Sequence, residues 1–117
     1  MFFHGTNKKF AKKIINEGLN KSSYVTTEFE FAAGYALRQG NEAVILYFDE
    51  NIKIESPQES AYWGEVEFIT KEKYFPSKIL IPKFNSLPSD YYELNDDISD
   101  RKYPEFFSSN SWQENNV

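Results

Sequence analysis

Three residues near the N-terminus, His4-Gly5-Thr6, carry groups that could bind a polar ligand. A histidine offers one hydrogen-bond donor and one acceptor, and a glycine lets a ligand approach the backbone closely. The alternative is a partly buried histidine bonded to a main-chain carbonyl, which is the commoner role. Because three residues form a weak motif, the assignment depends on what the chain places beside them.

Two tyrosines, Tyr24 and Tyr35, lie eleven positions apart. Tyr24 is expected just before a helix and Tyr35 two turns inside it, so the chain reverses between the two rings. Rings placed in this way can enclose a flat, electron-poor ring from both sides. The alternative is that both are ordinary core aromatics.

Two carboxylates, Glu65 and Glu67, alternate along a predicted strand, which puts them on one face of a sheet. Such a pair usually belongs to a solvated face. A carboxylate held beside a sugar can also stabilise positive charge that develops at the anomeric carbon, or it can orient a ribose hydroxyl.

The elements that must position these groups are two early helices and several strands. Asn7 is a favourable N-cap for a helix over residues 8–17, which Gly18 would end. Thr27 and Glu30 form a capping box, which predicts a second helix from Glu28 to near Gly40. Strands are expected from Phe2 and over residues 23–26, 43–48, 51–54, 64–69 and 78–82. The pattern predicts an α+β fold in which residues 43–48, the most apolar run, form a central strand.

The composition excludes several kinds of site. The chain has 117 residues, no cysteine and a single histidine, so disulfides, cysteine nucleophiles and multi-histidine zinc sites are excluded and no metal is expected. No apolar run approaches the ~20 residues of a membrane span, and the N-terminus lacks the apolar core of a signal peptide. We therefore expect a cytoplasmic protein with no membrane partner.

Charge is distributed unevenly along the chain, which has 13 basic and 18 acidic residues. Residues 1–84 are expected to form the core of one domain. Residues 85–117 hold all the excess negative charge, and they are expected to pack on the same domain through their aromatic side chains. An acidic end repels nucleic acid, although a local basic cluster is formed by Lys8, Lys9, Lys12, Lys13 and Lys21. The lysines of the first predicted helix suit a solvated face, or else a phosphate or an acidic partner.

The order and spacing of these groups resemble the ADP-ribosyltransferase superfamily, in the His-Tyr-Glu branch shared by diphtheria-type toxins and poly(ADP-ribose) polymerases. The resemblance spans about residues 2–82. It consists of His-Gly-Thr, a helix, Tyr-x-Thr-Thr, a helix with a second tyrosine eleven positions on, and a glutamate on a later strand. It implies an ADP-ribosyltransferase-like fold with central split β-sheets, two N-terminal helices and NAD bound by residues 1–84.

The resemblance also implies roles for single residues in binding NAD. His4 would bond the ribose on the adenine side, Gly5 would hold the nicotinamide carboxamide through its backbone, and Thr6 would bond a nearby hydroxyl. Tyr24 and Tyr35 would form the two walls of the nicotinamide slot.

The remaining residues of the motif complete the implied site. Thr26 and Thr27 belong to the NAD-binding segment, and Ala32 stands where many relatives carry a serine that donates to the carboxamide. Glu67 would engage the 2′-hydroxyl of the nicotinamide ribose. By analogy with the arginine-modifying branch, Glu65 would then meet the acceptor. Which of the two glutamates is catalytic stays open.

The implied activity is an NAD-dependent transfer of ADP-ribose to a macromolecular acceptor with release of nicotinamide. A protein acceptor is favoured over nucleic acid, and the role would be that of a toxin or effector in its own or a host cytosol. One alternative is an RNA 2′-phosphotransferase-like enzyme, but residues 1–85 contain Arg38 as their only arginine, and that activity calls for several basic groups. The other alternative is a catalytically inactive NAD-fold interaction module.

Overall fold

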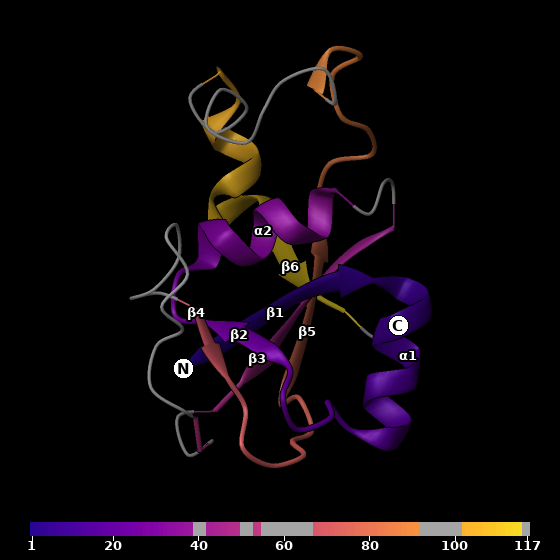
Figure 1. Ribbon diagram of the computed structural model, residues 1–117. Helices are drawn as coiled ribbons and strands as arrows, with labels where there is room; N and C mark the ends of the chain where they lie inside the picture. The colour runs from indigo at the N-terminus through magenta and orange to yellow at the C-terminus, as the bar shows by residue number, and fades with distance from the viewer. Residues whose placement is uncertain (39–41, 50–52, 55–66, 92–101, 116–117) are drawn as a thin grey trace.

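One antiparallel sheet and two helices form the described part of this α+β chain, seen in a computed structural model of residues 1–38, 42–49, 53–54, 67–91 and 102–115 (Figure 1). The strand order is β4-β2-β1-β3-β5-β6. The strands are β1 (Phe2–Asn7), β2 (Tyr24–Thr26), β3 (Ala43–Phe48), β4 (Glu67–Ile69), β5 (Lys78–Pro82) and β6 (Trp112–Glu114). The helices are α1 (Lys8–Glu17) and α2 (Phe29–Leu37), followed late in the chain by the 3-10 turns η2 (Pro104–Phe107) and η3 (Ser109–Ser111).

Helix α1 has the predicted bounds because both of its ends are set by local chemistry. The Asn7 side chain accepts a hydrogen bond from the Phe10 N–H at 2.9 Å, which satisfies one free donor of the first turn. Gly18 adopts a φ of 86° and donates its N–H to the Ile14 carbonyl at 2.7 Å. A side chain at this φ would be strained, so glycine ends the helix.

Helix α2 begins one residue later than expected, and the predicted capping box of Thr27 and Glu30 is wrong. The N-cap is Glu28, and its side chain makes no capping hydrogen bond. The Thr26 hydroxyl instead accepts from the Glu28 N–H at 3.1 Å. Glu30 is in the first turn, but because Glu28 is the N-cap, Glu30 is the second helical residue and not the third, which a capping box requires.

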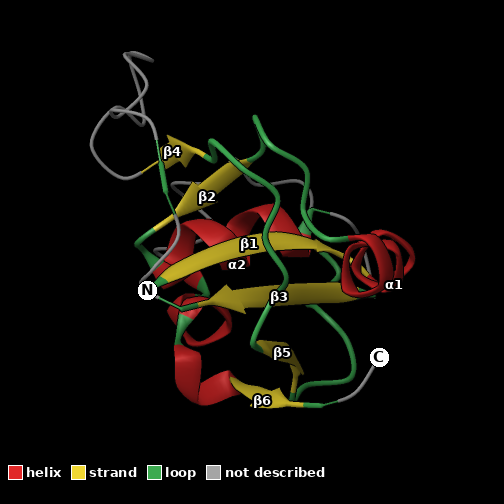
Figure 2. Cartoon of the chain, turned by 90° about the horizontal axis from the view of Figure 1, so that it is seen from below, coloured by secondary structure: helices red, strands yellow, loops and turns green. Residues whose placement is uncertain are grey.

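Small residues bring α2 close to the sheet. Ala32, Ala33 and Ala36 are fully buried, and they share a core cluster with Phe3 and Ile45. The opposite face of the sheet packs against α1 through a second cluster, and Figure 2 shows the two helices at different places on the sheet. Successive residues of β1 therefore alternate between an α2 face, with Phe3 and Gly5, and an α1 face, with Phe2 and His4.

The described strands form a single sheet, which corrects the expectation of split sheets. β1 and β3 pair over six residues, from Phe2 opposite Phe48 to Asn7 opposite Ala43. The ladder between β1 and β2 consists of one pair, Phe3 and Thr26, after which β2 and β4 diverge from β1 and β3 (Figure 2). The sheet is therefore continuous, but its connection is narrowest between β1 and β2.

Aromatic residues late in the chain lie in the core next to α2. Tyr91, Phe107 and Trp112 are buried in the same cluster as Phe3, and the Trp112 indole N–H donates to the Phe106 carbonyl at 3.0 Å. β6, a strand that the sequence did not indicate, pairs with β5. The expected strands over 43–48 and 78–82 are confirmed, while 51–52 and 64–66 lie outside the described residues.

Candidate functional site

Three of the predicted site residues, His4, Tyr24 and Glu67, lie on the neighbouring strands β1, β2 and β4. Phe3 is opposite Thr26, and Thr26 is opposite Glu67, so these backbones form one row across three strands. Beyond Phe3, no further pair joins β1 to β2 within the described residues. The edge of β1 that faces β2 therefore has no ladder pair at Gly5 among the described residues.

The backbone of Gly5 is directed toward this unpaired edge. The Tyr47 carbonyl accepts from the Ser77 N–H at 2.9 Å, so Tyr47 directs its backbone groups toward β5. The backbone N–H and C=O groups of successive residues in a strand point to alternate sides, so those of Leu46 point toward β1, where Leu46 is opposite His4. It follows that His4 bonds toward β3 and that Gly5 directs its N–H and C=O toward β2. Among the described residues, neither group of Gly5 has a ladder partner on that side.

Gly5 is a glycine because α2 lies against its other side. A Cβ built on Gly5 would lie 2.1 Å from the Ala32 carbonyl oxygen and 2.9 Å from the Ala36 nitrogen. No side chain fits in this space. The sequence pattern attributed the glycine to a ligand approaching the backbone, whereas the close neighbour in the structure is the helix.

The imidazole of His4 bridges the gap between the two strands. Its Nδ1 lies 2.7 Å from the Tyr24 carbonyl oxygen, and because a carbonyl only accepts, Nδ1 must carry the proton. Burial lowers the pKa of His4 below its ordinary 6.5, and this hydrogen bond opposes the shift without reversing it. His4 is therefore neutral at pH 7, and its Nε2 has a lone pair that can accept a hydrogen bond from a hydroxyl.

The two tyrosines are not core residues. Tyr24 is 53% exposed and Tyr35 is 37% exposed. Leu37 lines a small hollow with Pro82 on the β3–β5 side of α2. Tyr35 precedes Leu37 by two residues, about 200° around the helix, so it projects from the flank on the side of β2. The Arg38 guanidinium lies over the Tyr35 ring, 5.2 Å from its centroid.

The threonines and Ala32 are less accessible than the motif suggested. Thr6 and Thr26 are buried, and Thr26 holds the start of α2 through the Glu28 N–H. Thr27 is exposed. Ala32 is fully buried where α2 packs against Gly5 of β1, so its methyl group does not reach the surface.

Of the two predicted glutamates, the structure describes the backbone of Glu67. Glu67 is the first residue of β4, opposite Thr26. Glu65 lies outside the described residues. The pairing of β4 with β2 brings the start of the glutamate-bearing strand beside the Tyr24–Thr26 segment.

Thr70 supports the site, and the sequence reading did not single it out. Its hydroxyl accepts from the Ser23 N–H and donates to the Asn20 carbonyl, both at 3.1 Å, and the side chain is 1% exposed. These bonds fix the segment before Tyr24, including Ser22 at the unfavourable φ of 67°. No local motif indicates this role, because Thr70 and Ser23 lie 47 positions apart.

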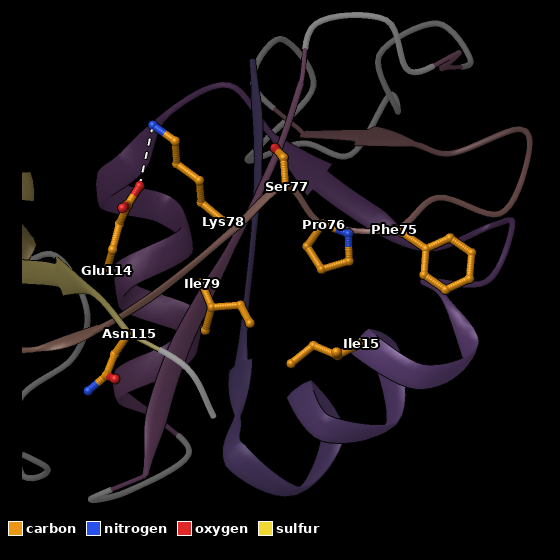
Figure 3. A pocket seen from close by; sticks show the side chains of 8 residues that line it. All are labelled: Ile15, Phe75, Pro76, Ser77, Lys78, Ile79, Glu114 and Asn115. Carbon is orange, nitrogen blue, oxygen red and sulfur yellow. Dashed lines mark ion pairs between the residues drawn. The ribbon is translucent and has the colours of Figure 1, made fainter.

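A separate surface cavity of about 640 Å³ lies between α1, β5 and β6 (Figure 3). It is lined by Ile15, Phe75, Pro76, Ser77, Lys78, Ile79, Glu114 and Asn115. Lys78 and Glu114 form an ion pair at 3.4 Å on one side, and the opposite side is apolar. None of the predicted site residues lines this cavity.

Within the part of the chain that the structure describes, no group of three or more His, Asp or Glu side chains is placed to hold a metal ion. No helix among those residues is both long and apolar enough to cross a membrane. Comparison of the chain with protein-family models, curated proteins and solved structures gives no significant match.

Proposed function

We propose that this protein binds NAD at the junction of β1 and β2 and transfers ADP-ribose to a macromolecular acceptor with release of nicotinamide. The observation that supports this most is the backbone of Gly5, which directs its N–H and C=O toward β2 beyond the last pair of the β1–β2 ladder, next to a neutral His4. A donor and an acceptor side by side on one strand edge are complementary to a primary carboxamide, which nicotinamide carries.

The residues around Gly5 suit the rest of the ligand. Tyr24 on β2 and Tyr35 on α2 are both exposed, and aromatic faces favour a flat, electron-poor ring such as nicotinamide. The Nε2 of His4 can accept a hydrogen bond from a ribose hydroxyl, because Nδ1 is already committed to the Tyr24 carbonyl. The four groups come from β1, β2 and α2, which the core holds together.

NAD supplies a glycosidic bond that breaks readily, because nicotinamide leaves it as a neutral molecule. In the proposed reaction the protein orients the nicotinamide ribose and keeps water away from it. Glu67 is assigned by the resemblance to the 2′-hydroxyl, where its negative charge would stabilise the positive charge of the transition state. Its position in register with Thr26 supports this assignment over one to a distant acid.

The first experiment measures release of nicotinamide from NAD by chromatography. We expect turnover by the wild-type protein, and a loss of about 100-fold or more in Glu67→Gln, which keeps the size of the side chain and removes its charge. Glu65→Gln tests the second carboxylate, and Glu105→Gln, on η2, is the matched control. Equal rates in Glu67→Gln and the wild type would refute the assignment.

A second experiment identifies the acceptor and separates the rival functions. The protein is incubated with labelled NAD and a cell lysate, and the product is digested with protease or with nuclease. Label removed by only one of these identifies the class of acceptor. Absence of NAD binding in calorimetry would favour the inactive interaction module, and removal of a 2′-phosphate from RNA would favour the phosphotransferase.

A further inference from the structure

An unusual combination of side chains covers the outer surface of α1. Phe10 is 51% exposed and lies among four exposed lysines, Lys8, Lys9, Lys12 and Lys13. Lys8 and Lys12, like Lys9 and Lys13, are one helical turn apart, so the four ammonium groups form two short rows on the solvent side. Within the described residues, none of the four makes an ion pair.

A second exposed aromatic extends this surface at the end of α1. Phe75 is 59% exposed, and both Phe75 and Lys73 lie against Gly18. The Phe75 ring stands beside α1 at one side of the 640 Å³ cavity, together with Ile15 and Pro76 (Figure 3). We call the outer face of α1, together with the two residues that lie against Gly18 at its C-terminal end, the α1 surface: Lys8, Lys9, Phe10, Lys12, Lys13, Lys73 and Phe75.

The positive charge of this surface acts locally although the whole chain is acidic. The molecule measures 38 × 34 × 21 Å, and η2 packs with α2 in the core cluster on the opposite face of the sheet from α1; Figure 1 shows its gold turns away from α1. Charges are screened over about 8 Å at physiological salt. The acidic residues near η2, such as Asp90 and Glu105, therefore do not cancel the field at α1. Closer to the helix are Glu17, on its last turn, and Glu42, whose carbonyl accepts from the Lys8 N–H, and the four lysines of α1 outnumber these two acids.

We propose that the α1 surface binds single-stranded nucleic acid. Lysine rows contact successive phosphates, and exposed aromatic rings give unpaired bases a face on which to stack; proteins that bind single strands without sequence preference combine these two features. The cavity beside Phe75 is within the usual size range of small-molecule sites, and its apolar side can take a base. A duplex would use the lysines, but its bases are paired inside the helix and would leave Phe10 and Phe75 without a base to stack on.

The test measures fluorescence anisotropy of labelled single strands of 12 thymidines or 12 uridines, without NAD. We expect a dissociation constant of about 1–100 µM at 50 mM salt, weakening as salt rises. The double variant Lys9→Gln/Lys13→Gln should lower the slope of log K against log salt by about 1.4, since each phosphate contact contributes about 0.7. Phe75→Ser should weaken binding about tenfold with an unchanged slope.

Controls keep this proposal separate from the proposed transferase activity. Lys102→Gln, on the η2 side, should bind the strands like the wild type, and all variants should keep their melting temperature and their turnover of NAD. Three outcomes would overturn the proposal: no binding at 50 mM salt, equal competition by polyglutamate, or equal affinity for a duplex together with wild-type binding by Phe75→Ser. None of them bears on NAD turnover, which is measured separately.

Discussion

Replacing Gly5 by alanine tests how closely α2 approaches β1. The new Cβ would lie 2.1 Å from the Ala32 carbonyl oxygen, while ordinary contact begins at 3.4 Å, so the helix must retreat by about 1.3 Å. The obstacle is backbone, which cannot rotate away as a side chain can. The retreat separates three fully buried alanines from the sheet, and we expect the free energy of unfolding to fall by about 3 kcal/mol. For a chain of this size the melting temperature should drop by roughly 10 °C.

Gly34→Ala is the matched control for this experiment. A Cβ on Gly34 would lie 3.6 Å from the Phe107 ring, which is ordinary contact. Alanine is favoured over glycine inside a helix, so this variant should gain about 0.5–1 kcal/mol. Urea unfolding of both variants should thus show changes of opposite sign for the same chemical substitution. A Gly5→Ala protein that melts within 2 °C of the wild type would refute the close approach of helix and strand.

Three further predictions concern Thr70, His4 and Tyr35. Thr70→Val should lower the free energy of unfolding by about 2 kcal/mol in urea titrations, because the Ser23 N–H loses its acceptor, while Thr70→Ser should lose less. The folded-state pKa of His4 is lowered, so its contribution to stability is complete above pH 6.5 and is lost as the pH falls through the folded pKa. Melting temperatures measured between pH 5 and 8 should therefore fall toward the acidic end, and His4→Gln should make this pH dependence weaker. Tyr35→Ala should weaken NAD binding about tenfold in calorimetry at an unchanged melting temperature, because the ring is exposed, whereas Phe75→Ala should bind NAD normally.

Local chemistry explains which elements could be predicted from the sequence. The bounds of α1 depend on Asn7 and Gly18, whose effects act within a few residues. The start of α2 was missed by one position because the Thr26 hydroxyl bonds the Glu28 N–H, and the sequence pattern does not distinguish this bond from a capping box at Thr27. The strand β6 was missed because its pairing with β5 joins segments some thirty residues apart, and three residues carry no clear period of their own.

For the candidate site, too, the sequence indicated the types of residue but not how the fold places them. The sequence indicated a histidine, two tyrosines and a glutamate, and the register brings the backbones of His4, Tyr24 and Glu67 to adjacent strands. It did not indicate that Ala32 would be buried behind Gly5, because the depth of helix packing depends on the whole sheet. The ladder between β1 and β2 likewise ends after one pair, which no local motif encodes.

The central claim is that NAD binds at the junction of β1 and β2, and amide chemical shifts during titration of the ¹⁵N-labelled protein with NAD test it most directly. We predict saturable shifts at Gly5 and at Tyr24 to Thr26, with no change at Ser77 to Ile79 beside the 640 Å³ cavity. Shifts confined to the cavity residues, or no shifts at millimolar NAD, would contradict the account.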